Sequence, residues 1–128
     1  MRDEFVVLVV EDNEANQLLA RCVLEREGYR VEVAGAADEA LEKLGEKVPN
    51  LILMDIQLPG KDGLSFTRQL KESRTTANIP IIALTAHAMI GDREATIAAG
   101  CAGYIAKPID TRTLGDQIRE ILAQASIE

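Results

Sequence analysis

The sequence predicts an α/β domain in which a five-stranded parallel sheet carries helices on both faces. Short apolar runs alternate with helical patterns, and the 128 residues fit one domain, so we expect residues 1–128 to fold as a single unit. Apolar residues make up 47% of the chain and aromatic residues only 3%, which leaves Val, Ile, Leu and Ala to build the core. That composition suits a buried parallel sheet with helices packed against it.

The first strand and helix are indicated by a change of apolar period. The almost continuous apolar run Phe5–Val10 predicts a buried strand. Glu14–Glu27 predicts a helix that ends at Gly28. One face of this helix carries an apolar stripe made of Ala15, Leu18, Leu19, Cys22 and Val23. Ala20 and Leu24 lie off that stripe, so contacts on two sides of the helix stay open.

The same alternation continues through the middle of the chain. Arg30–Ala34 predicts the second strand, and Ala37–Leu44 predicts a short helix ended by Gly45. Leu51–Met54 predicts a third, buried strand, and Leu64–Glu72 predicts the helix that follows it.

Two further strands and two helices complete the pattern. Ile81–Leu84 and Gly103–Ala106 predict strands, separated by a helix over Asp92–Ala99. The last helix, Thr111–Ala125, has an apolar face made of Leu114, Ile118, Ile121, Leu122 and Ala125. Alternating strands and helices imply right-handed parallel crossovers. We therefore expect a doubly wound fold whose ligands lie at the carboxyl ends of the strands. We assign it to the flavodoxin-like (β/α)5 class, whose common strand order is 2-1-3-4-5.

Charge and cysteine content restrict the binding partners and the cellular compartment that we expect for this chain. The chain has 21 acidic and 14 basic residues, a net charge of −7, which argues against binding to nucleic acid or to anionic membranes. No signal-peptide pattern or membrane-length apolar stretch occurs, so we expect a cytoplasmic protein. Cys22 and Cys101 lack CxxC spacing, and both are expected to be buried, reduced thiols.

Polar side chains follow four of the predicted strands. They are Glu11 and Asp12 after the first, Asp55 after the third, Thr85 after the fourth and Lys107 after the fifth. Parallel strands end at a common edge, so these side chains should converge. Three carboxylates at close range repel one another, and a hard divalent cation relieves that repulsion. The sequence indicates a site for Mg²⁺, with Mn²⁺ as an alternative, next to an anionic oxygen group.

The residues after the first strand argue against a nucleotide or flavin site. Such a site usually presents the backbone amides of a glycine-rich loop to phosphate, whereas this chain has two acids there. A flavin carrier usually also stacks aromatic side chains, and the chain has no Trp.

Four segments resemble the motifs of the response-regulator receiver family of two-component signalling. They occur in the family's order and spacing over essentially the whole chain, and four motifs in register are far more specific than one. The amino-acid sequences of these segments are most similar to those of receivers of hybrid sensor kinases and of single-domain regulators of the DivK type. The segments are Val9–Asn13, Leu51–Gly60, Leu84–Met89 and Gly103–Pro108.

The resemblance implies a role for each residue of the acidic cluster. Asp55 would be the phosphoacceptor. Asp12, Asp55 and the backbone carbonyl of Gln57 would bind Mg²⁺ directly, and Glu11 would act on the metal through water. Lys107 would pair first with the carboxylate and then with the phosphoryl oxygens.

The resemblance also implies a conformational switch. The hydroxyl of Thr85 would move to the phosphoryl group, and Tyr104 would change its burial as Thr85 moves. Gln57 and His87, two residues beyond the acceptor and the threonine, would tune the phosphoryl lifetime. The Lys107–Pro108 peptide bond is expected to be cis.

Together these residues predict a signalling switch rather than an enzyme with a separate substrate. A sensor histidine kinase or histidine phosphotransfer protein would donate the phosphoryl group, and the domain would catalyse only its own phosphorylation and dephosphorylation. A downstream effector protein would contact Asp92–Ala99, the strand at Tyr104 and Thr111–Ala125. Two alternatives stay open: a phosphate-relay receiver of a hybrid sensor kinase, and an aspartyl-nucleophile phosphohydrolase, which commonly has a second Asp where this chain has Gln57.

Overall fold

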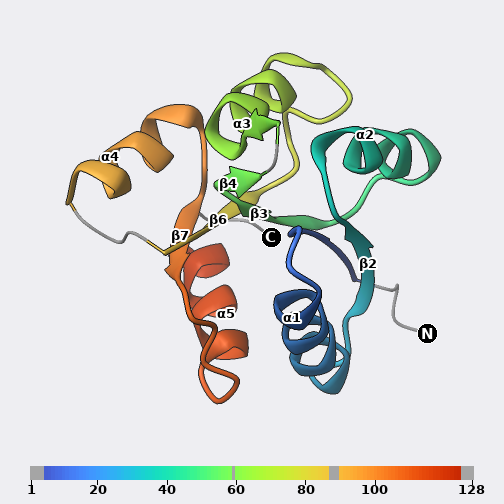
Figure 1. Ribbon diagram of the computed structural model, residues 1–128, viewed down its shortest axis with the longest axis vertical. Helices are drawn as coiled ribbons and strands as arrows, with labels where there is room; N and C mark the ends of the chain where they lie inside the picture. The colour runs from blue at the N-terminus through green and yellow to red at the C-terminus, as the bar shows by residue number, and fades with distance from the viewer. Residues whose placement is uncertain (1–4, 59, 87–89, 125–128) are drawn as a thin grey trace.

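A parallel sheet of five strands forms the centre of the computed structural model, which describes residues 5–58, 60–86 and 90–124. The sheet order is β2-β1-β3-β6-β7 (Figure 1). The strands are β1 (Val6–Val10), β2 (Arg30–Ala34), β3 (Leu51–Asp55), β6 (Ile81–Thr85) and β7 (Gly103–Ala106). This is the predicted order, because β6 and β7 are the fourth and fifth strands of the sheet along the chain.

The labels β4 and β5 belong to a small hairpin directly after β3. It consists of β4 (Gln57–Leu58) and β5 (Lys61–Asp62), which pair in antiparallel fashion. The sequence did not predict this hairpin, since strands of two residues have no hydrophobic period to detect.

Helices cover both faces of the sheet. They are α1 (Glu14–Arg26), α2 (Ala37–Glu46), α3 (Gly63–Glu72), α4 (Ile90–Ala99) and α5 (Leu114–Gln124). In Figure 1, α1 and α5 lie on one face of the sheet, and α2, α3 and α4 lie on the other. The fold is therefore doubly wound, as predicted. Within the described ranges, none of these helices combines the length and apolarity needed to cross a membrane.

Each face of the sheet has its own apolar core. Leu8 and Val10 of β1 belong to the cluster under α2 and α3, whereas Val7 and Val9 belong to the cluster under α1 and α5. The central strands β1, β3 and β6 are buried at every position, as expected for parallel strands covered on both sides. The sheet is thus a rigid platform whose carboxyl edge carries the polar side chains.

The buried face of α1 differs from the predicted stripe. Of that stripe only Val23 is buried; Leu18 is 61% exposed, and Cys22 is also exposed, so the expectation of a buried thiol is wrong there. Ala20, Val23 and Leu24 pack on the sheet instead. The helix has apolar residues on two neighbouring faces, and contact with the sheet buries the face that carries Ala20 and Leu24.

The second cysteine is buried, as predicted. Cys101 is 7% exposed and belongs to the core cluster under α2 and α3. Burial raises the pKa of its thiol to about 11, so the reactive thiolate form is scarce at neutral pH.

Some element ends also differ from the sequence prediction. Gly28 follows α1 with φ of 97°, as predicted for a helix-ending glycine, and Gly100 follows α4 in the same way with φ of 106°. Gly45 lies inside α2 and does not end it. The last helix begins at Leu114, after a turn over residues 111–113, and not at Thr111. Ala125, expected on its apolar face, lies outside the described residues.

Gly63, the first residue of α3, packs directly against the end of β3. Its amide donates to the carbonyl of Ile56 at 2.7 Å. A Cβ at Gly63 would lie 2.2 Å from the Asp55 carbonyl oxygen and 2.7 Å from Ile56 Cα, and backbone atoms cannot move aside as a flexible side chain can.

We therefore predict that Gly63→Ala lowers the free energy of unfolding by about 1–3 kcal/mol, the usual cost of overpacking. Urea denaturation would measure the change. Gly45→Ala is the matched control, because apart from adjacent residues and the backbone of its own helix nothing lies within 4 Å of a Cβ there. Alanine is the better helix former by about 0.5–1 kcal/mol, so this control should be more stable than the wild type. Equal effects of the two substitutions would contradict the close approach at Gly63.

Candidate functional site

The loop Glu11–Asn13, called the acid loop below, places two acidic side chains at the carboxyl edge of the sheet. Glu11 is 1% exposed, whereas Asp12 is exposed. The Glu11 amide donates to the carbonyl of Ala34 at 2.9 Å, which ties the loop to β2. Asn13 then caps α1, since its Oδ1 accepts a hydrogen bond from the Asn16 amide at 3.0 Å. β1, β2 and α1 together determine where the two acids lie.

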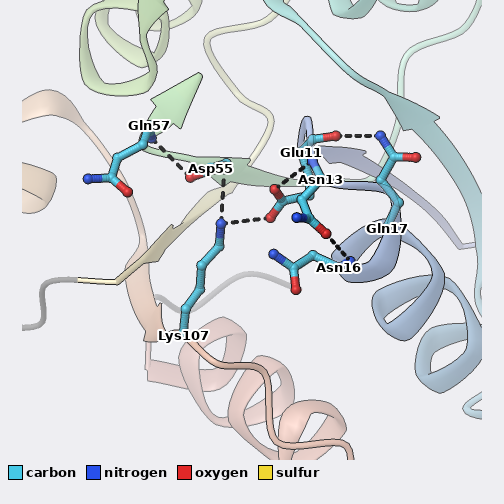
Figure 2. A network of polar contacts seen from close by, with 7 residues as sticks. All are labelled: Glu11, Asn13, Asn16, Gln17, Asp55, Gln57 and Lys107. Atoms are coloured by element: carbon cyan, nitrogen blue, oxygen red, sulfur yellow. Dashed lines mark hydrogen bonds and ion pairs between the residues drawn. The ribbon is translucent and has the colours of Figure 1, made fainter. Parts of the chain in front are cut away.

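Asp55 is the last residue of β3 and is 2% exposed. Its Oδ1 accepts a hydrogen bond from the Gln57 amide at 2.9 Å, and its Oδ2 lies 3.1 Å from Lys107 Nζ. In Figure 2 the Asp55 carboxylate lies near Glu11, and the Gln57 side chain points away from it. Both carboxylate oxygens are therefore held in place, one by the hairpin backbone and one by an ammonium group.

Lys107, the residue after β7, bridges two carboxylates from different strands. Its Nζ lies 2.8 Å from Glu11 Oε1 and 3.1 Å from Asp55 Oδ2 (Figure 2). Its backbone amide donates to the carbonyl of Thr85 at 2.7 Å, which extends the β6–β7 ladder as far as the lysine. The Lys107–Pro108 peptide bond is cis, as the resemblance implied.

Burial and charge act in opposite directions on these groups. Burial raises the pKa of Glu11, although Lys107 and the Asn13 amide favour its ionised form. Burial alone would lower the pKa of Lys107, but its contacts with Glu11 and Asp55 outweigh burial and raise that pKa above the usual value. Lys107 is therefore a firmly charged ammonium at neutral pH.

The cluster has the oxygen ligands and the charge that a divalent cation requires. Glu11, Asp12 and Asp55 each offer a carboxylate oxygen, and these oxygens lie within 4.8 Å of one another. When ionised, the three acids and Lys107 carry a net charge of −2 (three negative, one positive). Oxygen ligands with excess negative charge fit Mg²⁺ or Mn²⁺. The predicted metal residue Gln57 adjoins this cluster through its amide contact with Asp55.

Thr85 lies at the same edge of the sheet as the acids. It is the last residue of β6 and is buried. The β3–β6 register pairs Asp55 with Leu84, so Thr85 is one position beyond the residue opposite Asp55. The structure thus brings Thr85, Asp55 and Lys107 together. The position of His87, assigned to lifetime tuning, lies outside the described residues.

Tyr104 lies on the edge strand β7, beside residues of α4 and α5. It is partly buried against the core cluster under α2 and α3. The Arg93 guanidinium of α4 lies over its ring, 5.8 Å from the centroid, within the range of a cation–π interaction. A shallow groove beside the ring is lined by Gln117, Glu120 and Ile121 of α5. Tyr104 therefore connects the edge strand to that surface.

Two contributions to the site were missed by sequence reasoning. Gln17 of α1 donates from Nε2 to the carbonyl oxygen of Glu11 at 2.5 Å, and Gly63 allows α3 to approach Asp55. The spacing of Gln17 offered a weak signal, because it stands four residues after the Asn13 cap and so on the same side of the helix.

The site and the fold agree with comparisons to known proteins. A family model for the response regulator receiver domain matches residues 7–119. The chain belongs to this family. The polar-differentiation response regulator DivK of Brucella ovis is 44% identical to this receiver over 119 residues, which cover 93% of this chain and 97% of DivK. Receivers are two-component signalling domains, and they interact in general with histidine kinases and downstream effectors.

Solved structures of receivers give the same result. A putative response regulator from Chloroflexus aurantiacus has a TM-score of 0.87 at 30% identity, with 94% of this chain and 99% of that chain covered. The receiver domain of a sensor histidine kinase from Pseudomonas aeruginosa has a TM-score of 0.81 at 35% identity, with 97% and 99% covered. That receiver has a magnesium ion coordinated in its active-site cleft.

The raised pKa of Glu11 generates a prediction about stability and pH. Because the folded state holds the Glu11 proton more tightly than the unfolded state, ionising Glu11 costs stability as pH rises through its folded pKa. Without divalent cations, Glu11→Gln should therefore be more stable than the wild type at neutral pH, and the gain should disappear in acid. Thermal unfolding across that pH range would test this, and a gain that persists unchanged in acid would contradict it.

Proposed function

We propose that Asp55 accepts a phosphoryl group in a Mg²⁺-dependent reaction, and that phosphorylation switches the contact of this receiver with a protein partner. The observation that carries the proposal is the setting of Asp55. Its buried carboxylate ends a central strand, pairs with Lys107, and lies within 4.8 Å of the other carboxylates of the cluster. Family membership and the magnesium-bound Pseudomonas receiver support the same chemistry.

Asp55 acts as the nucleophile in this proposal. One of its carboxylate oxygens attacks the phosphorus of a phosphohistidine or of a small acyl phosphate. The new O–P bond forms as the bond from phosphorus to the leaving group breaks, and the leaving group takes the electron pair. Bound Mg²⁺, held by Asp12, Asp55 and the Gln57 carbonyl and by Glu11 through water, would supply the positive charge that stabilises this transfer.

Lys107 changes partner during the reaction. Its Nζ is already 3.1 Å from Asp55 Oδ2, so it reaches a phosphoryl oxygen attached to Asp55 with little movement. A charge-assisted hydrogen bond of this kind contributes about 1.5–3 kcal/mol. Lys107 therefore stabilises both the transfer and the phosphorylated state.

Thr85 and Tyr104 couple phosphorylation of Asp55 to a conformational change of the surface formed by α4, β7 and α5. The Thr85 hydroxyl is drawn to the phosphoryl group, and Tyr104 follows into the space it leaves. That movement takes the tyrosine ring away from Arg93, whose guanidinium lies 5.8 Å from its centroid. Phosphorylation thus favours one of two conformations of the surface formed by α4, β7 and α5, where a downstream effector binds.

The phosphoryl donor is a sensor histidine kinase or a histidine phosphotransfer protein in the cytoplasm. The domain catalyses only its own phosphorylation and dephosphorylation, and Gln57 and His87 tune the rate of phosphoryl loss. The exposed side chain of Gln57, two residues beyond Asp55, supports its part. Its amide cannot transfer a proton as a second Asp would, which argues against a phosphohydrolase.

We predict that acetyl phosphate with Mg²⁺ adds one phosphoryl group, on Asp55. Intact mass spectrometry would detect the adduct, and Asp55→Asn is the matched control because it keeps the size of the side chain and removes the nucleophile. Omission of Mg²⁺ should lower the yield strongly. An equal yield on Asp55→Asn would mean that another residue is the acceptor.

The switch has a separate readout. Beryllofluoride, a phosphoryl mimic, should shift the amide resonances of Tyr104, α4 and α5 as well as those beside Asp55. Shifts restricted to the neighbourhood of Asp55 would leave a receiver that only relays phosphate, as in a hybrid sensor kinase.

A further inference from the structure

We propose that Gln17 is a positioning residue that holds the backbone at Asp12 and thereby sets the affinity of the site for divalent cations. This inference rests on the proposed function, because it assigns a further residue to the same metal site. Gln17 lies on α1 and is not one of the three acids of the carboxylate cluster.

The three carboxylates of the cluster are supported in different ways. Glu11 and Asp55 each accept a hydrogen bond from a backbone amide and each pair with Lys107. The Asp12 carboxylate makes no hydrogen bond or ion pair with any residue that the structure describes. Its direction therefore depends on the backbone that carries it.

Gln17 fixes the peptide unit directly before Asp12. The carbonyl of that unit is the Glu11 oxygen, which accepts a hydrogen bond from Gln17 Nε2 at 2.5 Å (Figure 2). Because a carbonyl oxygen can only accept, the amide nitrogen of Gln17 must face it, which defines the orientation of the side chain. Rotation of this peptide unit would turn Asp12 away from the other carboxylates.

Gln17 is well anchored for this role. Its backbone amide donates to the carbonyl of Asn13 at 2.9 Å, within the first, side-chain-capped turn of α1. The Glu11 amide, on the other side of the acid loop, donates to Ala34 at 2.9 Å. The acid loop is thus held between β2 and α1, and the Gln17 side chain supplies the α1 contact to the peptide unit before Asp12.

Gln17→Met tests the proposal, because methionine has a similar length and helix propensity and lacks the donor. We expect the Mg²⁺ dissociation constant to rise about three- to tenfold, the effect of losing one hydrogen bond. Titration with MgCl2 followed by amide NMR shifts would measure it on the folded protein, and thermal unfolding would show how much protein is folded. Gln124→Met on α5 is the matched control, and it should bind Mg²⁺ like the wild type.

A double-mutant cycle separates positioning from general stabilisation of the fold. If Gln17 acts through Asp12, Gln17→Met should weaken Mg²⁺ binding little or not at all in an Asp12→Asn background. Unchanged affinity in Gln17→Met, or an equal loss in Gln124→Met, would overturn the role of Gln17 and leave the proposed function intact. A wild-type protein that does not bind Mg²⁺ would overturn the proposed function and, with it, this inference.

Discussion

The contact of Lys107 with Glu11 and Asp55 is the interaction on which the site depends. Three carboxylates lie within 4.8 Å of one another at the end of the sheet, and only one of them is exposed. Lys107 Nζ, at 2.8 and 3.1 Å from the two buried acids, offsets part of the repulsion between them. One ammonium cannot balance three acids, so the folded protein keeps an excess of negative charge that a divalent cation or a rearrangement must relieve.

The fold places these charges with very little dedicated structure. In a parallel sheet with this order, β1 and β3 are neighbours at the centre, so residues that follow them meet without long loops. The ladder bond from Lys107 to Thr85 brings the lysine to the same edge. Gly63 and Gln17 then adjust the two loops, one by leaving space beside Asp55 and the other by holding the carbonyl of Glu11. These few local contacts position the two loops at the end of the sheet.

The sequence could predict features that follow from hydrophobic periodicity and from the residues at the ends of strands. The five sheet strands and the convergence of Glu11, Asp55 and Lys107 follow from the alternation and from the residues after each strand, and the strand order follows from the fold class. The buried face of α1 could not be predicted, because two apolar faces compete and only contact with the sheet selects Ala20 over Leu18. The β4–β5 hairpin and the Gln17 contact also escaped, since both depend on short-range geometry that leaves no periodic signal.

The central claim is that an unbalanced carboxylate cluster makes this receiver a divalent-cation site. Thermal unfolding of the wild type and of Asp12→Asn, each with and without MgCl2, tests it most directly. The account predicts that Asp12→Asn is the more stable protein without the cation, because it removes one of three repelling charges. It also predicts that Mg²⁺ raises the unfolding temperature of the wild type and has much less effect on Asp12→Asn. An equal rise in the two proteins, or a variant that is less stable than the wild type without Mg²⁺, would contradict it.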